Sequence, residues 1–336
     1  MALARPQERW NKITSFFLIL ILSIIIGFRY RVGEDWGNYI INFEKIKFVE
    51  NVFLNKEFLF SGLNVISNKL NLGIYGVNVV CASIFSFGLI IFCRSLERQW
   101  LALTLSVPYI VIVIAMGYTK QSVALGILMI GFVVLSQGKK LLYLLLNIFA
   151  SLFHLSSIVG IVFLAPYYIS SPKLINKISK IIISIYFLRV LYLVFIEKFL
   201  GIYIRNYVTE YQSSSSGVYI RLFLVVFPSI LFLFLGKNLQ LNKNQKIIWK
   251  YISFYSLSLI PLLIISPSNT IIDRMALYAL PIMIFILSKL PELKFAKFSK
   301  KYTNLSAVLM AFLIQFIWLN FAVTSRAWDP YQNILF

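Results

Sequence analysis

The chain has 336 residues, of which 60% are hydrophobic and 13% charged, and its mean hydropathy is +0.83. These values exclude an ordinary soluble domain and indicate an all-α polytopic integral membrane protein. The formal net charge is +20. The basic residues lie in short loops between apolar runs, where they orient a membrane protein, so nucleic acid is not expected as a partner.

Apolar runs recur along the whole chain. A helix that crosses the hydrocarbon core of a bilayer needs about 20 apolar residues. Such runs cover roughly 12–28, 74–93, 100–116, 119–136, 178–196, 219–235, 247–266, 274–290 and 303–323. A further apolar stretch, 141–168, is long for one span and short for two, and the chain's only histidine, His154, lies at its middle.

The distribution of loop charge decides how the stretch 141–168 is placed. With a cytoplasmic N-terminus, two crossings by this stretch keep the later lysine clusters cytoplasmic, whereas a single crossing puts them outside, against the positive-inside rule. We therefore expect two short helical segments that meet near His154, eleven crossings and one membrane domain over 1–336. Irregular backbone at membrane depth is tolerated only in protein or beside a cavity, so His154 is expected to mark a cavity near the outer side.

Two long segments are expected on that outer side. In the first, about 29–73, the spacing of Tyr39, Phe43, Ile46, Val49 and Phe53 predicts an amphipathic helix on the membrane surface. The second, about 197–218, contains Arg205 and ends in four serines and a glycine, which predicts a mobile loop or lid.

Residues 28–39 follow the first span and hold two arginines, two acids and several aromatics. One interpretation is an interfacial loop with an aromatic belt. The other is a polar site for an anionic ligand, because arginine binds phosphate through a bidentate fork. Basic residues at other outer span ends suit a diphosphate-bearing lipid, although any one of them could instead reach to the headgroups. The basic residues at or near outer span ends, those of this segment included, are Arg29, Arg31, Lys120, Arg205, Arg221, Arg274 and Arg326, and Arg189 lies inside a span.

His154 could act as a general base or donate a hydrogen bond to a phosphate, and the alternative is a buried structural histidine. No metal or cofactor is expected. The sequence has three aspartates without D-x-D spacing, no C-x-x-C and no Gly-rich phosphate loop. Because no Gly-rich phosphate loop is present, the energy for a reaction would come from the substrate's own leaving group rather than from a nucleotide.

The two cysteines do not indicate a disulfide. Cys81 and Cys93 lie in one span, too far apart along a helix to be bridged.

Six short motifs in order resemble those of the EpsG-type polysaccharide polymerases, relatives of the bacterial O-antigen polymerase Wzy. Lysine replaces the usual arginine at Lys120, and the proline that usually follows Glu57 is absent. The motifs are Arg31 to Tyr39 (R-x-G-x-D-[YW]-x-x-Y), Glu57 to Asn64, Lys120-Gln121-Ser122-Val123-Ala124, Phe153-His154-Leu155-Ser156, Arg274-Met275-Ala276-Leu277-Tyr278 and Pro330-Tyr331.

The resemblance implies a metal-independent glycosyltransferase at the periplasmic face of the bacterial inner membrane. Donor and acceptor would be glycans linked to undecaprenyl diphosphate, and a chain-length regulator and a flippase are implied partners. His154 or Asp35 would take the acceptor proton. The substrate-binding residues would be Arg29, Arg31, Tyr39, Lys120, Gln121, Arg205, Arg274 and Tyr278.

Two other functions remain as alternatives. Membrane O-acyltransferases that modify surface polysaccharide usually carry a histidine in an early span, whereas the histidine here lies in mid-chain. A flippase for lipid-linked oligosaccharides would also need a cationic cavity, but many transporters show related halves, and no internal repeat is visible here.

Overall fold

The computed structural model describes residues 1–5, 7–46, 52, 57–169, 215, 217–266, 268–292 and 300–336. Within these ranges the protein is helical, and its only β-bridge joins Arg29 and Asn333. The α-helices are α1 (Lys12–Gly27), α2 (Trp36–Lys45), α4 (Phe58–Lys69), α5 (Gly73–Arg94), α6 (Gln99–Ser106), α7 (Thr119–Ser136), α8 (Lys140–Phe153), α9 (Ala165–Ile169), α12 (Val218–Leu235), α13 (Lys243–Ile265), α14 (Asn269–Leu277), α15 (Pro281–Lys289) and α16 (Lys300–Phe321). Other helical segments are the π-helix η1 (Val107–Ala115) and the 3₁₀ helices η2 (Leu155–Leu164), η4 (Gly236–Asn238), η5 (Leu290–Glu292) and η6 (Val323–Ala327).

Five of the described helices are long and apolar enough to cross a membrane, namely α5, α7, α12, α13 and α16. A sixth candidate is the pair formed by α14 and α15 with η5, which bends by 50°. Shorter apolar helices cover Lys12–Gly27, Gln99–Ala115, Lys140–Phe153 and Leu155–Tyr167. The chain is therefore a helical, multi-pass membrane protein. The count of eleven crossings stays a prediction, and the expected span 178–196 lies outside the described residues.

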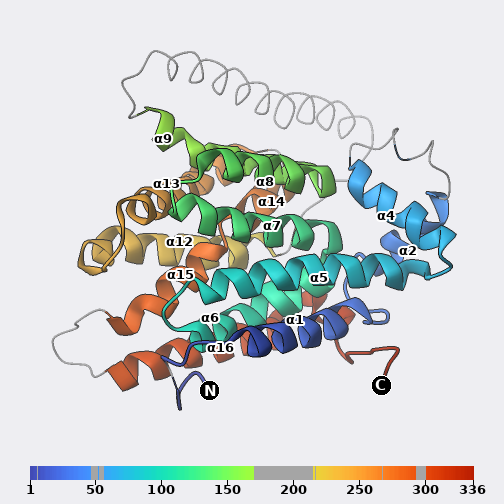
Figure 1. The fold of residues 1–336 in the computed structure, drawn as a ribbon, viewed down its shortest axis with the longest axis horizontal. Helices are drawn as coiled ribbons and strands as arrows, with labels where there is room; N and C mark the ends of the chain where they lie inside the picture. The colour runs from blue at the N-terminus through green and yellow to red at the C-terminus, as the bar shows by residue number, and fades with distance from the viewer. Residues whose placement is uncertain are drawn as a thin grey trace.

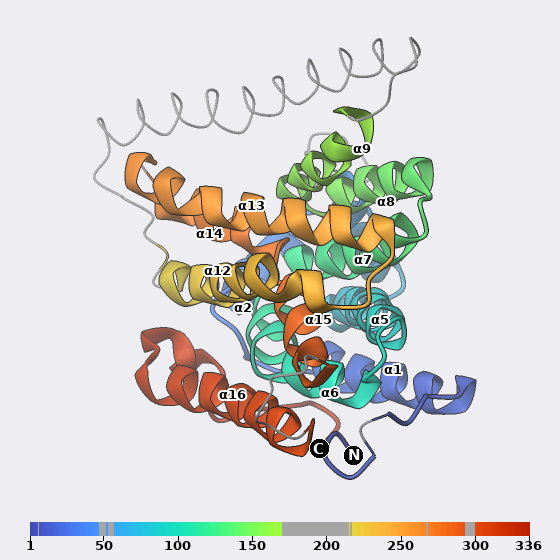
Figure 2. The same ribbon diagram turned by 90° about the vertical axis from the view of Figure 1, so that its left-hand side faces the viewer.

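The helices form two adjoining layers, and α2 and α4 lie together at one end (right in Figure 1). In one layer α8, α7, α5 and α1 follow one another side by side, as Figures 1 and 2 both show. In the other layer the order is α13, α12, α15, α6 and α16 (Figure 2). Helix α7, which carries Lys120 and Gln121, packs between α5 and α8 and is buried along much of its length.

Two facing glycines bring α5 and α7 into close contact. A Cβ atom added at Gly88 would lie 2.0 Å from the carbonyl oxygen of Gly126, and one added at Gly126 would lie 2.7 Å from the Cα atom of Phe85. Small residues at helix interfaces let membrane helices approach until their backbones touch. This contact sets the position of α7, and with it the position of Lys120.

Alanine is expected to have opposite effects at two helical glycines. At Gly62, in α4, an added Cβ meets nothing within 4 Å, so alanine should stabilise the helix by about 0.5–1 kcal/mol. At Gly88 the same methyl group would push α5 away from α7, at a cost of about 1–3 kcal/mol. Thermal unfolding of both variants in one detergent tests this, and a Gly88→Ala protein as stable as wild type would contradict it.

The helical stretch breaks at His154, as predicted. Helix α8 ends at Phe153, His154 is extended (φ −150°, ψ 114°), and η2 starts at Leu155. The two segments run antiparallel, because the Tyr143 hydroxyl donates to the Gly160 carbonyl oxygen (2.8 Å) and the Asn147 amide donates to that of Ser157 (2.9 Å). The chain therefore turns back at the histidine, as the loop charges indicated.

The predicted amphipathic segment is helical over α2, where Trp36 and Tyr39 are buried. Its later positions Val49 and Phe53 lie outside the described residues. The loop before α2 is held by residues from the far end of the sequence. The backbone N–H of Tyr30 donates to the Gln332 carbonyl oxygen (2.9 Å), and that of Ile334 donates to the Phe28 carbonyl oxygen (3.0 Å).

Candidate functional site

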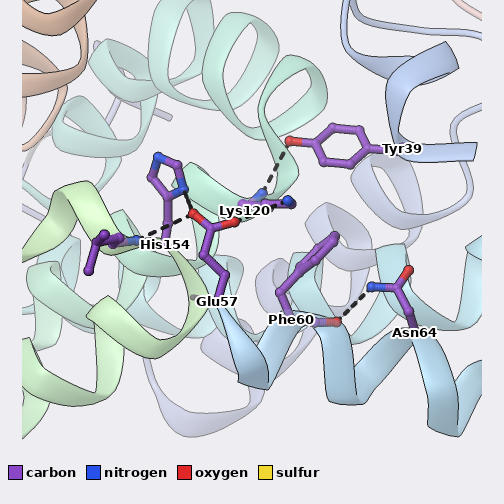
Figure 3. Close-up of polar contacts among 7 residues, drawn as sticks. Tyr39, Glu57, Phe60, Asn64, Lys120 and His154 are labelled. Atoms are coloured by element: carbon purple, nitrogen blue, oxygen red, sulfur yellow. Dashed lines mark hydrogen bonds and ion pairs between the residues drawn. The ribbon is translucent and has the colours of Figure 1, made fainter. Parts of the chain in front are cut away.

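The side chains of Lys120 and His154, both distant in sequence from Glu57, contact its carboxylate (Figure 3). Glu57 is the residue before α4. Its Oε2 atom accepts a hydrogen bond from Lys120 Nζ at 3.0 Å, and its Oε1 atom is hydrogen-bonded to His154 Nδ1. The backbone N–H of Leu155, at the start of η2, also donates to Oε1 (3.4 Å). One carboxylate thus joins the start of α4, the first turn of α7 and the break between α8 and η2.

Aromatic side chains hold Lys120 in this position. Its ammonium group lies 4.8 Å from the centre of the Phe60 ring, and its backbone N–H donates to the Tyr39 hydroxyl (3.4 Å). The rings of Tyr39 and Phe60 are 5.9 Å apart. Cation–π contact and a buried tyrosine therefore orient the lysine toward Glu57 (Figure 3).

Glu57 is ionised in this arrangement. Burial raises the pKa of its carboxyl group, but the hydrogen bonds and positive charge supplied by His154 and Lys120 outweigh burial and lower that pKa to about 2. Its side chain is 20% exposed. The carboxylate is therefore a fixed negative charge at neutral pH.

Asp35 belongs to the same site electrostatically. Burial raises the pKa of its carboxyl group, while a hydrogen bond from Asn38 and the charges of Arg274, Lys120 and His154 act in the opposite direction. Its side chain makes no cap hydrogen bond to α2. Asp35 is therefore a half-buried carboxyl group near three basic residues.

The loop that carries Asp35 depends on glycines. Gly33 has a φ of +99°, and an added Cβ would lie 2.8 Å from the Cα atom of Gly117. A Cβ on Gly117 would in turn lie 2.4 Å from the Trp328 ring. The N–H of Gly33 donates to the Ala327 carbonyl oxygen (2.8 Å). This stack fixes the loop against the turn that precedes α7.

Arg274 comes from α14 and is half-buried. The preceding residue, Asp273, is paired with Arg221 of α12 (2.6 Å), and both of those side chains are buried. Arg274 forms no ion pair with any residue that the structure describes. Its charge acts on Asp35 and Tyr278. Binding of an anionic ligand by Arg274 stays a prediction.

Tyr278 directly follows α14 and is buried, with its hydroxyl 3.0 Å from Ser156 Oγ. Gln121, the residue after Lys120, is also buried, and its Oε1 atom has no hydrogen-bond partner within the described structure. Gln121 thus lies beside Lys120 on α7, and Tyr278 contacts the η2 segment that follows His154.

The two arginines near the first span have different surroundings. Arg29 is 1% exposed and donates to the Ile26 carbonyl oxygen and to Thr119 Oγ1, both at 2.7 Å. Arg31 has a positive φ of 54°, is exposed, and lies over the Tyr30 ring. Arg29 thus supports the loop from inside, while Arg31 reaches the surface. Substrate binding by either arginine stays a prediction.

Arg205 and nearly all of the expected lid, 197–218, lie outside the described residues. An open cavity of about 290 Å³ is found beside the C-terminal segment, lined mainly by apolar residues such as Ile112 and Trp318. It contains none of the predicted site residues, so the cavity expected at His154 stays a prediction.

The sequence did not indicate Glu57 as a catalytic or substrate-binding residue. A single glutamate in a long loop has no periodicity or neighbouring acid to mark it. The only signal for its importance was its position in a family motif.

The model of a protein family described as the EpsG family matches residues 12–333, nearly the whole chain. No curated protein and no solved structure matches.

Proposed function

Since the chain belongs to the EpsG family of Wzy-like polysaccharide polymerases, we propose that it joins undecaprenyl-diphosphate-linked repeat units into a surface polysaccharide. The growing glycan on its lipid diphosphate is the donor, and the non-reducing end of a new lipid-linked unit is the acceptor. Family membership supports the polymerase class. The choice of lipid diphosphate as donor rests on the chemistry of the site.

The observation that carries this choice is the meeting of basic residues with two carboxyl groups. Lys120 and His154 are bound by Glu57, and Arg274 is without an ion-pair partner in the described structure. Arginine stays charged when it is desolvated and matches the geometry of phosphate. Such a site suits a substrate with a diphosphate at one end and a neutral hydroxyl at the other.

In the proposed reaction an acceptor hydroxyl attacks the anomeric carbon of the donor. The bond from that carbon to the diphosphate oxygen breaks, and lipid diphosphate leaves. Arg31 and Arg274 stabilise the departing negative charge. His154 or Asp35 accepts the hydroxyl proton.

We further propose that the N-terminus is cytoplasmic and that the site faces the periplasm of a bacterial inner membrane. The loop charges support this orientation. The partners in this proposal are a flippase that delivers the lipid-linked units and a regulator of chain length.

Deletion of the gene in its host, followed by electrophoresis of the surface polysaccharide, tests the function. The expected result is collapse of the long ladder to a single repeat unit, because units are still made and attached but not joined. An unchanged ladder with a different mass per repeat would instead identify an acyltransferase. Loss of every repeat unit would identify a flippase.

A further inference from the structure

The hydrogen bond between His154 and Glu57 fixes the form of the imidazole ring. An ionised carboxylate accepts hydrogen bonds and has no proton to donate. His154 Nδ1 must therefore carry the proton that it shares with Glu57 Oε1. In the neutral ring the lone pair that can accept a proton is then on Nε2.

The Nε2 atom is free to use that lone pair. It is buried and has no hydrogen-bond partner within the described structure. Buried polar atoms are rarely left unpaired, and those that are call for an explanation such as a catalytic role. A substrate hydroxyl that reached Nε2 would complete its hydrogen bonding.

Glu57 itself is a poor base, because its pKa of about 2 makes proton transfer to it unfavourable near neutral pH. It is also held at both oxygens, by Lys120 Nζ on one and by the His154 ring and the Leu155 N–H on the other. This rigid carboxylate can orient the ring and stabilise the imidazolium that forms when Nε2 takes a proton.

We propose that Glu57 is the positioning residue of a Glu57–His154 pair in which His154 Nε2 is the general base. This inference rests on the proposed polymerase function and decides between its two candidate bases. The acceptor O–H proton moves to Nε2 as the oxygen bonds to the anomeric carbon and the carbon–diphosphate bond breaks. Lys120 then holds Glu57 through its hydrogen bond, and Asp35 acts on the pair through charge.

The sole histidine of the sequence permits a direct test that needs no activity. The protein is produced with isotope-labelled histidine and a histidine-free tag. The NMR chemical shifts of the two ring nitrogens are recorded at a pH where the imidazole is neutral. Protonated Nδ1 and unprotonated Nε2 are expected. In Glu57→Gln the donor Lys120 Nζ takes the single side-chain oxygen, so the amide NH2 faces Nδ1 and donates to it, and the ring proton should move to Nε2. A wild-type ring protonated at Nε2 would overturn the proposal.

Kinetics supply the second test, with purified lipid-diphosphate-linked repeat units in liposomes. Glu57→Gln should lower kcat by about 10²- to 10⁴-fold with little change in KM. Glu57→Asp should recover part of the rate. The control is Glu44→Gln, which removes an equal charge from an exposed position on α2 and should act as wild type.

Within the described structure His154 and Lys120 act electrostatically on Glu57 and Asp35, and Arg274 acts on Asp35. If wild type joins repeat units and Glu57→Gln does so equally fast, the pairing is wrong and the polymerase function stands. If wild type joins none, the proposed function fails, while the nitrogen shifts still report the pairing.

Discussion

Arg274→Ala is expected to slow the joining of repeat units by about 10²- to 10³-fold in kcat, the loss typical of removing one donor from a charge-stabilising site. Arg274 is half-buried, forms no ion pair in the described structure, and acts electrostatically on Asp35. Its free guanidinium can therefore bind the departing diphosphate. The measurement is the steady-state rate with lipid-linked repeat units in liposomes.

Charge-preserving variants separate geometry from charge. Arg274→Lys and Arg31→Lys keep the positive charge but lose the bidentate fork, so both should remain well below the wild-type rate. Arg94→Lys is the matched control, since Arg94 is exposed in the last turn of α5 and lies on the expected cytoplasmic side, and it should leave the rate unchanged. Normal polymerisation by both of the first two variants would refute the bidentate role.

The second large effect is expected in stability rather than rate. Arg221→Met leaves the Asp273 carboxylate buried without its partner, which should cost about 3–5 kcal/mol of unfolding free energy. The two side chains are 2% and 8% exposed, and Arg221 also donates to the Tyr109 hydroxyl (3.2 Å). Denaturation in detergent, followed by circular dichroism, measures the loss.

The double variant Arg221→Met with Asp273→Leu is the control for that experiment. It removes both charges, and replacing a buried pair by apolar side chains is often neutral or stabilising. It should therefore recover most of the stability lost in the single variant. An Arg221→Met protein that unfolds like wild type would show that Asp273 has no need of this arginine.

Hydropathy and charge predict much of the fold because a bilayer imposes simple rules. A spanning helix must be apolar over a set length, and loop lysines must stay on one side. The predicted apolar runs within the described residues fall on helices, and the break falls at His154. The bend between α14 and α15 has only one signal in the sequence, Pro281, which begins α15 and lacks the N–H of an uninterrupted helix. Proline alone does not predict the bend, because Pro228 and Pro261 lie inside α12 and α13.

Hydropathy and loop charge predicted less of the site, because the site consists of contacts between residues that are distant in the sequence. Glu57 and His154 are 97 positions apart, and neither residue type reveals its partner. Arg29 and Arg31 appeared equivalent in the sequence. The structure buries the first and exposes the second, with the chain entering a positive φ at Arg31. Only three-dimensional contacts distinguish an arginine that supports a loop from one that reaches outward.

The stack of Gly33, Gly117 and Trp328 has a consequence for biosynthesis. The ribosome makes the loop that bears Asp35 about 290 residues before it makes Ala327 and Trp328. The loop therefore cannot take its final position while the chain is still being inserted, because the carbonyl and the ring that hold it do not yet exist. A nascent chain halted before Ala327 would have its early helices in the membrane but an unformed site, so activity should appear only after Ala327 and Trp328 have been made.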